Sequence, residues 1–382
     1  MKKKVFTALG LMSGTSMDGV DLSLIKTDGH SQFHSILDNY YEFDEKLRFK
    51  IVKLREKINI LEDLTINIEE INTLEREFTL FHANIINDIL INFGDEIDLI
   101  GFHGQTIFHN PEVKISKQIG DGNLLSQLTK KIIINNFRDE DLINGGQGAP
   151  LTPIFHKLIS EIIIKKDQIS LPINIINIGG ITNVTQVHFD KNEKISISFA
   201  SDIGPGNCLI DEWIRKNSKK KFDKNGEIAK SGKVNELILN QAVDNFSSDL
   251  IGKSLDIKDF DVSFVKGLTL EDGCSTLTEF TAHLIAMGIQ SFNKKNNIFP
   301  INNILCGGGR KNDFLKTKIK KNLKIDNSNF LNIDEYGLKG DFIESQCFGY
   351  LSVRSFLRLP ISFPNTTGCE KPISGGTLNK NF

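Results

Sequence analysis

The segment Gly10–Asp21 gathers glycine, hydroxyl and acidic residues between two apolar stretches, in the order G-L-M-S-G-T-S-M-D-G-V-D. Because this segment has few bulky side chains, backbone N–H groups can converge on a phosphate while serine and threonine hydroxyls donate further hydrogen bonds. Asp18 can hold Mg²⁺ through water. Glycines with positive φ angles also build plain hairpins, so the segment is either a phosphate-binding turn or an ordinary hairpin.

Three later segments repeat the pattern of glycine after an apolar stretch: Asn177–Gly180, Ser201–Asn207 and Cys306–Gly309. A glycine after a strand and before a helix lets a ligand approach the backbone at the positive end of the helix dipole, which favours phosphates. Because several such turns occur in one chain, their combination favours a phosphate ligand over a set of ordinary turns.

Two similar series of strands and helices are predicted to position these turns. Short or alternating apolar runs predict strands, and apolar residues at three- and four-residue spacing predict amphipathic helices. In the first half, strands are predicted over 5–12, 20–27, 33–43, 97–102 and 131–136, and a helix over 71–89. In the second half, strands are predicted over 173–178, 181–189, 195–199 and 301–305, and helices over 206–217, 276–292 and 341–356. The repeated order predicts two α/β lobes, with a boundary near 144–148.

Length, charge and cysteine use exclude several classes of protein. The 382 residues fit two lobes, and a formal net charge of -2 leaves no basic excess for binding nucleic acid. No apolar run approaches the roughly 20 residues of a membrane helix, so we expect no membrane partner. The apolar stretch after Lys4 is short, which favours a buried first strand over an export signal. The five cysteines lack a C-x-x-C pair, which argues against disulfides and a zinc site and favours a reducing compartment.

Several motifs spread over nearly the whole chain together resemble one family. They are Gly10–Asp21, Gly101–Thr106, Gly145–Leu151, Asp202–Asn207, Glu271–Cys274 and Thr366–Gly368. In this combination the chain resembles the anhydro-N-acetylmuramic acid kinases of the actin/hexokinase ATPase superfamily. The resemblance implies an α/β fold of two ribonuclease H-like lobes with an active site in the cleft between them.

The lobes implied by this resemblance divide the candidate residues between them. The N-terminal lobe would comprise 1–143 and 360–382, with the phosphate-binding turn and part of the sugar site. The C-terminal lobe would comprise 144–359, with the catalytic aspartate and a glycine motif on the adenosine side.

The same resemblance implies an unusual double reaction. Water opens the 1,6-anhydro ring of 1,6-anhydro-N-acetylmuramic acid at C1, and the freed O6 takes the γ-phosphate of ATP. The products are N-acetylmuramic acid 6-phosphate and ADP. The resemblance further implies a role in peptidoglycan recycling and amino-sugar catabolism, a requirement for ATP and Mg²⁺, a cytoplasmic location and a homodimer.

Individual residues take roles from the resemblance, and each has a structural alternative. Asp202 matches the catalytic aspartate, or it caps a helix. Glu344 helps to position the water, or it lies on a solvated helix face. Arg138 faces the sugar, where its guanidinium can bind a carboxylate through two hydrogen bonds, or it forms a surface salt bridge. His103 bonds sugar hydroxyls, or it is a packed core residue.

The remaining implied contacts are with the sugar and with ATP. Gln105 and Thr106 join His103 and Arg138 at the sugar. The implied ATP contacts are Gly14, Thr15, Ser16, Met17, Asp18, Gly19, Val20, Asp21, Gly179, Gly180, Gly204, Gly206, Asn207, Gly307, Gly308 and Gly309.

Two departures from the family pattern leave efficiency and substrate preference open. Asn135 and Asn136 precede Phe137 where the family usually has an aspartate, and Ala200-Ser201 alter the usual lead into Asp202. Two other functions also stay open. One is another sugar kinase of the same superfamily, in which the aspartate deprotonates the sugar directly. The other is a non-enzymatic, nucleotide-dependent actin-like protein, which would hydrolyse ATP without any sugar.

Overall fold

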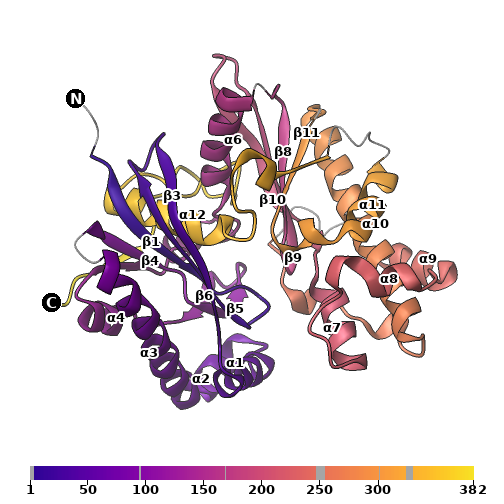
Figure 1. Ribbon diagram of the computed structural model, residues 1–382, viewed down its shortest axis with the longest axis horizontal. Coiled ribbons are helices and arrows are strands. Elements are labelled where there is room, and N and C mark those ends of the chain that lie inside the picture. The colour runs from indigo at the N-terminus through magenta and orange to yellow at the C-terminus, as the bar shows by residue number, and fades with distance from the viewer. Residues whose placement is uncertain (1–3, 94–95, 168, 247–253, 301, 324–329) are drawn as a thin grey trace. The chain divides into compact units, whose positions relative to one another are not determined.

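The computed structural model describes residues 4–93, 96–167, 169–246, 254–300, 302–323 and 330–382. It divides into two compact units: unit 1 comprises Met1–Leu158 and Phe342–Phe382, and unit 2 comprises Ile159–Asp341 (Figure 1). The chain enters unit 2 within helix α6 (Pro153–Asp167) and returns to unit 1 after Asp341. None of the described helices is both long enough and apolar enough to cross a membrane.

Unit 1 is built on a six-stranded sheet with the order β13-β7-β4-β1-β2-β3. Its strands are β1 (Phe6–Met12), β2 (Gly19–Thr27), β3 (Phe33–Glu42), β4 (Leu99–Phe102), β7 (Ile132–Asn135) and β13 (Thr377–Asn379). Strands β1, β2 and β3 form an antiparallel meander, and β4 and β7 run parallel to β1. Nearly every side chain of β1 and β4 is buried, which explains their continuous apolar sequences.

Helices and a separate hairpin complete unit 1. They are α1 (Glu45–Lys57), α2 (Leu61–Ile66), α3 (Ile68–Phe93), α4 (Gly122–Thr129), α5 (Asp139–Ile143), α12 (Ile343–Phe356) and the hairpin of β5 (Gln105–Asn110) with β6 (Ile115–Ile119). Helix α12 touches the centre of the sheet at two glycines. A Cβ on Gly10 would lie 1.9 Å from the Ser345 carbonyl oxygen, and one on Gly101 would lie 2.3 Å from that of Phe348. Only glycine permits this close approach of helix and strand.

Unit 2 is built on a five-stranded sheet with the order β10-β9-β8-β11-β12. Its strands are β8 (Ile173–Ile178), β9 (Ile181–Phe189), β10 (Ile195–Pro205), β11 (Asn302–Cys306) and β12 (Phe330–Asn332). Its helices are α7 (Cys208–Asn217), α8 (Glu227–Ser231), α9 (Glu236–Asn245), α10 (Leu270–Asn296) and α11 (Asp313–Leu323). The long helix α10 begins at the cap Thr269, whose hydroxyl accepts from the Asp272 N–H, and packs against β10 and α11.

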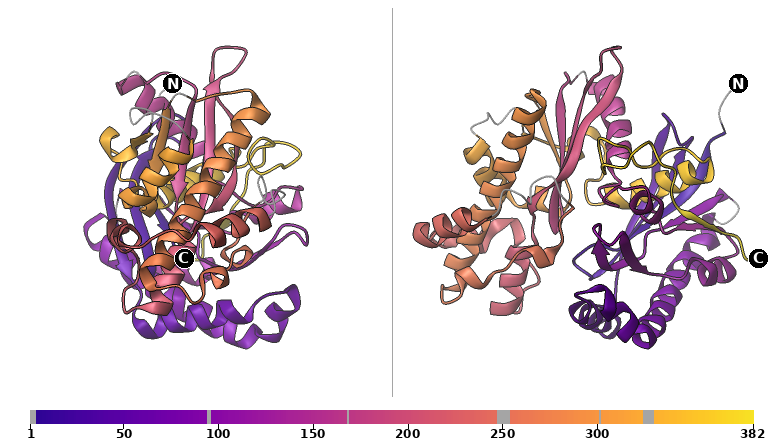
Figure 2. Two further views of the ribbon diagram at one scale, coloured as in Figure 1. Left: turned by 90° about the vertical axis from the view of Figure 1, so that its right-hand side faces the viewer. Right: turned by 180° about the vertical axis from the view of Figure 1, so that it is seen from behind.

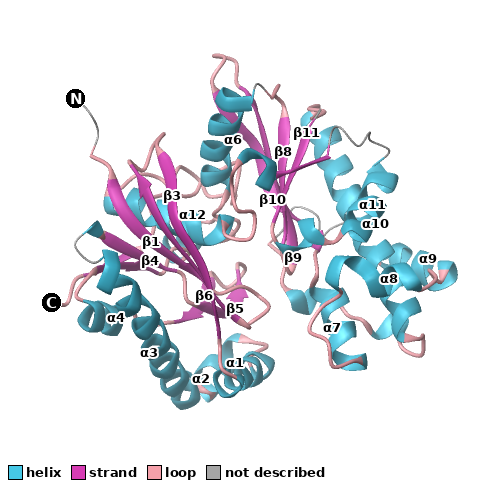
Figure 3. Ribbon diagram, viewed as in Figure 1, coloured by secondary structure: helices cyan, strands magenta, loops and turns pink. Residues whose placement is uncertain are grey.

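The two sheets repeat one topology. In each, three antiparallel strands form a meander, and two further strands run parallel to the first strand of that meander. Figure 3 shows one such sheet with its helices in each unit, and Figure 2 shows the same elements from the side and from behind. This is the strand order of a ribonuclease H-like lobe, so the prediction of two α/β lobes of this kind is confirmed.

The lobe boundaries differ from the predicted ones. Residues 144–158 and 342–359 were assigned to the C-terminal lobe, but both segments belong to unit 1. The reason for the second difference is α12, whose backbone packs directly on the glycines of β1 and β4.

Several elements also extend beyond their predicted ends. Strand β10 continues past residue 199 to Pro205, since its pairing with β9 resumes after a bulge between Ile197 and Phe199. Helix α3 covers 68–93 rather than 71–89, and α10 covers 270–296 rather than 276–292. Ile301, the predicted first residue of β11, lies outside the described residues.

Candidate active site

The turn between β1 and β2 exposes two of its three hydroxyl residues, while Ser13 is buried. Thr15 and Ser16 are exposed, and the Ser16 hydroxyl donates to Asp18 Oδ1 at 2.5 Å. A Cβ on Gly14 would meet no atom closer than 4.0 Å. Met17 has a φ of 52°, a left-handed conformation that is costly for a non-glycine residue. The turn therefore combines an open backbone around Gly14 with an exposed Thr15 hydroxyl, an arrangement that suits a phosphate ligand.

Asp18 belongs to an acidic group around Tyr40. Burial raises the pKa of Tyr40, and the charges of Asp18, Glu42 and Asp21 raise it further. Among the described residues, no group of three or more His, Cys, Asp or Glu side chains is arranged to hold a metal ion. Mg²⁺ keeps several waters and takes few protein ligands, so the Asp18 carboxylate fits a water-mediated contact rather than a cage of protein ligands.

The end of the predicted ATP turn lies inside β2. Val20 is fully buried and pairs with Tyr41, and Gly19 pairs with Glu42. A Cβ on Gly19 would lie 2.4 Å from the Tyr41 carbonyl oxygen. The Val20 side chain therefore packs in the core, and only the backbone of Gly19 and Val20 is left for a ligand.

His103 and Arg138 form one hydrogen-bonded chain in unit 1. Arg138 Nη2 donates to His103 Nε2 at 2.9 Å, and Nη1 donates to the Gly148 carbonyl oxygen at 2.8 Å. His103 Nδ1 donates to the Gly104 carbonyl oxygen at 2.8 Å. Burial, and then the charge of Arg138, lowers the pKa of His103 to about 3. The imidazole is therefore neutral near pH 7, with its proton on Nδ1, and it orients the guanidinium.

The other predicted sugar contacts adjoin the phosphate turn. Gln105 Nε2 donates to the Gly14 carbonyl oxygen at 3.2 Å, and Gln105 Oε1 is buried and accepts no hydrogen bond from the described residues. The Thr106 hydroxyl accepts from Gln118 Nε2 at 3.2 Å. Gln105 thus contacts the turn directly, while Thr106 is hydrogen-bonded within the β5–β6 hairpin.

Glu344 lies in the first turn of α12 and is half-buried. Burial raises the pKa of the Cys347 thiol well above its usual range, with the charge of Glu344 raising it further and that of Arg138 lowering it. The ring of Phe348, the next residue, lies 4.5 Å from that of His103. Helix α12 therefore brings Glu344 to the region of unit 1 that holds His103 and Arg138.

Asp141 joins two of the sequence motifs. It is 1% exposed, its Oδ2 accepts from the Gly148 N–H at 2.7 Å, and its Oδ1 accepts from the Thr367 hydroxyl at 2.6 Å. The Gln147 N–H donates to the Thr367 carbonyl oxygen at 2.8 Å. This buried carboxylate fixes the loop whose Gly148 carbonyl in turn orients Arg138.

In unit 2, Asp202 lies within β10 and is 7% exposed. Its Oδ2 accepts from the Leu255 N–H at 2.9 Å, and its partner across the β9–β10 ladder is Asn183. Helix α7 has Asn207 as its N-cap residue, so the helix-cap alternative for Asp202 does not hold. The strand that carries Asp202 and the loop N–H of Leu255 together fix the direction of this carboxylate.

Two glycine turns of unit 2 bind to each other. The N–H groups of Gly206 and Asn207 donate to the carbonyl oxygens of Gly180 and Gly179, both at 2.8 Å, and Gly204 is buried in β10. A Cβ on Gly206 would lie 2.2 Å from the Gly179 carbonyl oxygen. These N–H groups at the start of α7 are therefore already used. The turns can give a ligand a surface to pack on, but not these hydrogen-bond donors.

The third glycine turn packs on the same strand ends. Gly307 has a φ of 75°, and a Cβ there would lie 2.4 Å from Asn177 Oδ1. A Cβ on Gly309 would lie 2.2 Å from the Ile178 side chain. Gly308 is exposed, and its Cβ position is 3.9 Å from Asn207 Nδ2. The structure thus gathers all the predicted glycine turns of unit 2 at one end of its sheet.

Comparison with known proteins gives the family. A family model for anhydro-N-acetylmuramic acid kinase matches residues 6–381. The chain belongs to the anhydro-N-acetylmuramic acid kinase family. The kinase of that name from Pelagibacter ubique is 53% identical over 383 residues and 100% of both chains. The one from Zymomonas mobilis is 38% identical over 97% of this chain and 99% of the relative.

A comparison of structures matches the activator of 2-hydroxyisocaproyl-CoA dehydratase from Clostridium difficile with bound ADPNP. The TM-score is 0.40 and the identity 9%, over 92% of this chain and 97% of that chain. Membership of the kinase family rests on the sequence matches, and it makes this chain an enzyme of the kinase class.

The departure from the family pattern before Phe137 has a simple backbone explanation. Asn136 has a φ of 52°, and asparagine and aspartate both tolerate this left-handed conformation better than other non-glycine residues. Asn135 lies in β7, where its Oδ1 accepts from Asn379 Nδ2 at 2.9 Å. An asparagine at 136 therefore keeps the local backbone that presents Arg138.

Sequence reasoning missed two residues that organise these regions, Asp141 and Arg310, and a buried polar side chain beside Asp202, Asn183. Asn183 Oδ1 is buried beside Asp202 and accepts no hydrogen bond from the described residues. Arg310, directly after the glycine triplet, is 3% exposed. Its position directly after the glycine triplet was the available signal, because an arginine beside a turn that is predicted to bind a ligand is a candidate either to contact that ligand or to hold the turn.

Proposed function

We propose that this kinase phosphorylates 1,6-anhydro-N-acetylmuramic acid with ATP while water opens the anhydro ring. Water oxygen bonds to C1, the bond from C1 to O6 breaks, and O6 takes the γ-phosphoryl group as ADP leaves. The products are N-acetylmuramic acid 6-phosphate and ADP. The observation that carries the proposal is the buried Asp202, held in a strand of a chain that matches this family from residue 6 to residue 381.

Asp202 is the proposed general base. Its carboxylate is nine-tenths buried and anchored through Oδ2 by the Leu255 N–H, which leaves it little rotational freedom. A positioned carboxylate that takes a proton from the attacking water contributes roughly 10²–10⁴-fold to the rate. Glu344 is proposed to help orient that water.

Arg138 is the proposed contact for the carboxylate of the sugar acid. Its guanidinium is held from one side by the neutral His103 and from the other by the Gly148 carbonyl. A prepositioned guanidinium can bind a carboxylate through two parallel hydrogen bonds without losing further side-chain entropy. Gln105 and Thr106 are the proposed direct contacts for the sugar's polar groups. The two ring nitrogens of His103 already bond Gly104 and Arg138, so its proposed role in the sugar site is to hold Arg138.

The open turn Gly14–Asp18 is proposed to bind the ATP phosphates, together with the backbone of Gly19, Val20 and Asp21. The proposed contacts in unit 2 are Gly179, Gly180, Gly204, Gly206, Asn207, Gly307, Gly308 and Gly309. When bound, Mg²⁺ would neutralise charge on the transferring phosphoryl group. Asp18 would hold that ion through water, in keeping with its hydrogen bond from Ser16 and its acidic neighbours.

A cytoplasmic location is supported by cysteine chemistry. All five cysteines are free thiols, and four of them are buried, as expected for a protein of a reducing compartment. The family resemblance supports a homodimer, which sedimentation equilibrium would test directly. A monomer at micromolar concentration would contradict the homodimer.

The experiment that tests the reaction uses purified protein, Mg-ATP and 1,6-anhydro-N-acetylmuramic acid in oxygen-18 water. We expect ADP release that depends on the sugar, and one labelled oxygen at C1 of a 6-phosphorylated product by mass spectrometry. A phosphorylated product without the label would point to an ordinary sugar kinase. ADP release without dependence on the sugar would overturn the assignment and favour an actin-like ATPase.

A further inference from the structure

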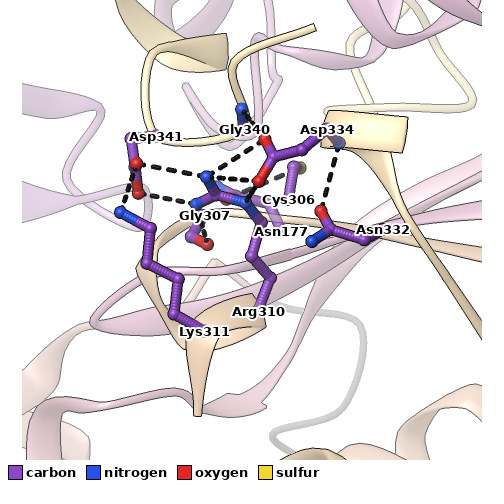
Figure 4. A network of polar contacts seen from close by, with 9 residues as sticks. All are labelled: Asn177, Cys306, Gly307, Arg310, Lys311, Asn332, Asp334, Gly340 and Asp341. Carbon is purple, nitrogen blue, oxygen red and sulfur yellow. Dashed lines mark hydrogen bonds and ion pairs between the residues drawn. The ribbon is translucent and has the colours of Figure 1, made fainter. Parts of the chain in front are cut away.

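Arg310 is buried next to the glycine triplet and uses all of its donors. Nε and Nη2 donate to the two oxygens of Asp334 at 2.9 and 3.1 Å. Nη1 and Nη2 donate to the two oxygens of Asp341 at 2.6 and 3.1 Å. The second N–H of Nη1 donates to the Gly307 carbonyl oxygen at 3.0 Å (Figure 4). A guanidinium has five N–H groups, so none is left for a ligand.

The same network holds Gly307 by both of its backbone groups. Its carbonyl oxygen accepts from Arg310, and its N–H donates to the Gly340 carbonyl oxygen at 2.9 Å. The Gly340 N–H in turn donates to Asp334 Oδ1 at 2.8 Å. A Cβ on Gly340 would lie 2.4 Å from Arg310 Nε, so glycine is required for the segment to reach the guanidinium.

We propose that Arg310 is a positioning residue for the nucleotide, acting through the turn Gly307–Gly309 and never touching the ligand. Asp334 and Asp341 are its two anchors, and together these three residues form the Arg310 clamp. The proposal rests on the proposed function, since it takes this turn to border the adenosine. Without the clamp, the left-handed Gly307 loses the hydrogen bonds that fix its backbone, and the nucleotide must then order the turn itself.

The geometry explains why this residue is arginine. Two carboxylates lie in the plane of one guanidinium, and each receives two hydrogen bonds. A lysine keeps the charge but has three donors on a single nitrogen, so it cannot serve two carboxylates and the Gly307 carbonyl with this geometry. Arg310→Lys therefore removes the shape of the clamp while it preserves the net charge.

The test compares Arg310→Lys and Asp341→Asn with the wild type, by calorimetric titration of the purified full chain with Mg-ADP in the absence of sugar. We expect the Kd for Mg-ADP to rise about tenfold in Arg310→Lys, as loss of charge-assisted hydrogen bonds implies. Asp341→Asn should raise it in the same direction by a smaller factor. In turnover assays the KM for ATP should rise alike, with the KM for the sugar within about twofold of wild type.

The matched control is Lys316→Gln, which removes the ion pair between the half-buried Lys316 and the exposed Asp313 (2.7 Å) in the same unit. It should leave the Kd for Mg-ADP unchanged, since surface pairs contribute little. If Arg310→Lys and Asp341→Asn lower only the unfolding temperature and keep the wild-type Kd, the clamp is a structural ion pair and the inference is wrong. If the wild type binds no Mg-ADP, the proposed function fails instead, so the two failures are distinguishable.

Discussion

Unit 1 and unit 2 share a strand order but differ in the turn that follows the first strand. In unit 1 the turn Ser13–Asp18 exposes hydroxyl groups and has room around Gly14. In unit 2 the turn Gly179–Gly180 is short, and its carbonyl oxygens accept the N–H groups of Gly206 and Asn207. The same strand order thus carries an open turn in unit 1, which can donate hydrogen bonds to a ligand, and a closed turn in unit 2, whose carbonyl oxygens are bonded within the protein.

The difference teaches that a shared topology does not assign chemistry to its loops. The hydrogen bonds that a loop makes to its own protein decide which donors remain for a ligand. A similar contrast separates two of the buried aspartates, Asp141 and Asp202. Asp141 in unit 1 accepts from a loop N–H and a hydroxyl of a distant motif, whereas Asp202 in unit 2 is fixed by its strand and by the Leu255 N–H.

The largest expected effect separates these two aspartates. Asp202→Asn should lower kcat by roughly 10³-fold, because the proposed base is lost, with little change in the free energy of unfolding. Asp141→Asn should instead lower the free energy of unfolding by about 2 kcal/mol, because an amide cannot accept both hydrogen bonds as a carboxylate does. Initial rates and urea unfolding of both variants measure this. Equal loss of activity and stability in both would remove the distinction.

The next effect compares a closed turn with an open one. Gly206→Ala should destabilise the protein by about 3 kcal/mol, since the added Cβ lies 2.2 Å from a backbone oxygen that cannot move freely. Gly14→Ala should change the free energy of unfolding by less than about 0.5 kcal/mol, because its Cβ meets nothing closer than 4.0 Å. Denaturant midpoints check both. A destabilised Gly14→Ala would show that the unit 1 turn is closed as well.

A third prediction concerns acid and unit 1. The pKa of His103 is lowered to about 3 by burial, whereas an unfolded histidine titrates near 6.5, so the unfolded state binds more protons between these values. Stability should therefore fall as the pH drops below about 6.5. His103→Gln should flatten the pH dependence of the unfolding free energy by about 1.4 kcal/mol per pH unit between 6 and 5. Parallel curves for wild type and variant would contradict the neutral imidazole.

The smallest effect lies in unit 2 at lower pH. Burial acts to raise the pKa of Asp341, but its hydrogen bonds from Arg310 and Lys311 outweigh this and hold the pKa below the usual value. The contribution of this pair to stability is therefore complete above about pH 4 and is lost as the pH falls through the lowered pKa. We expect less than about 1 kcal/mol, because the carboxylate is partly exposed. The difference in unfolding midpoint between wild type and Asp341→Asn should shrink from pH 5 to pH 3.

Much of the fold could be predicted because its signals are local. The alternating and continuous apolar runs of β1, β2, β8 and β9 give their strands directly, and the apolar stripe of α3 gives its helix. The end of β10 was missed since Gly204-Pro205 reads locally as a turn, while pairing with β9 keeps it in the strand. Pairing across a sheet is not visible in a single segment.

The organising residues of the candidate site could not be predicted for the same reason. The partner that makes Asp141 a structural acceptor, Thr367, is 226 positions away, and the Arg310 anchors lie 24 and 31 positions downstream. Arg138 lies in unit 1 and the glycine turns after β8 and β11 lie in unit 2, as predicted. Asp202, which was predicted in a turn, lies inside β10, and the glycine segment 144–148 belongs to unit 1 rather than to the C-terminal lobe. The boundary between units was displaced because the contact of α12 with Gly10 is also long-range.

The placement of α12 has a consequence for synthesis of the chain. Unit 1 draws its central helix from Phe342–Phe382, which is synthesised after the whole of unit 2, whereas unit 2 is continuous from Ile159 to Asp341. Domains generally fold as units as they emerge. All elements of unit 2 are therefore present before α12 is made. Until then, β1 and β4 of unit 1 have an uncovered apolar face. The strands of unit 1 that precede unit 2 in the chain therefore complete their folding after unit 2, and during that interval their exposed edges must be kept from pairing with one another.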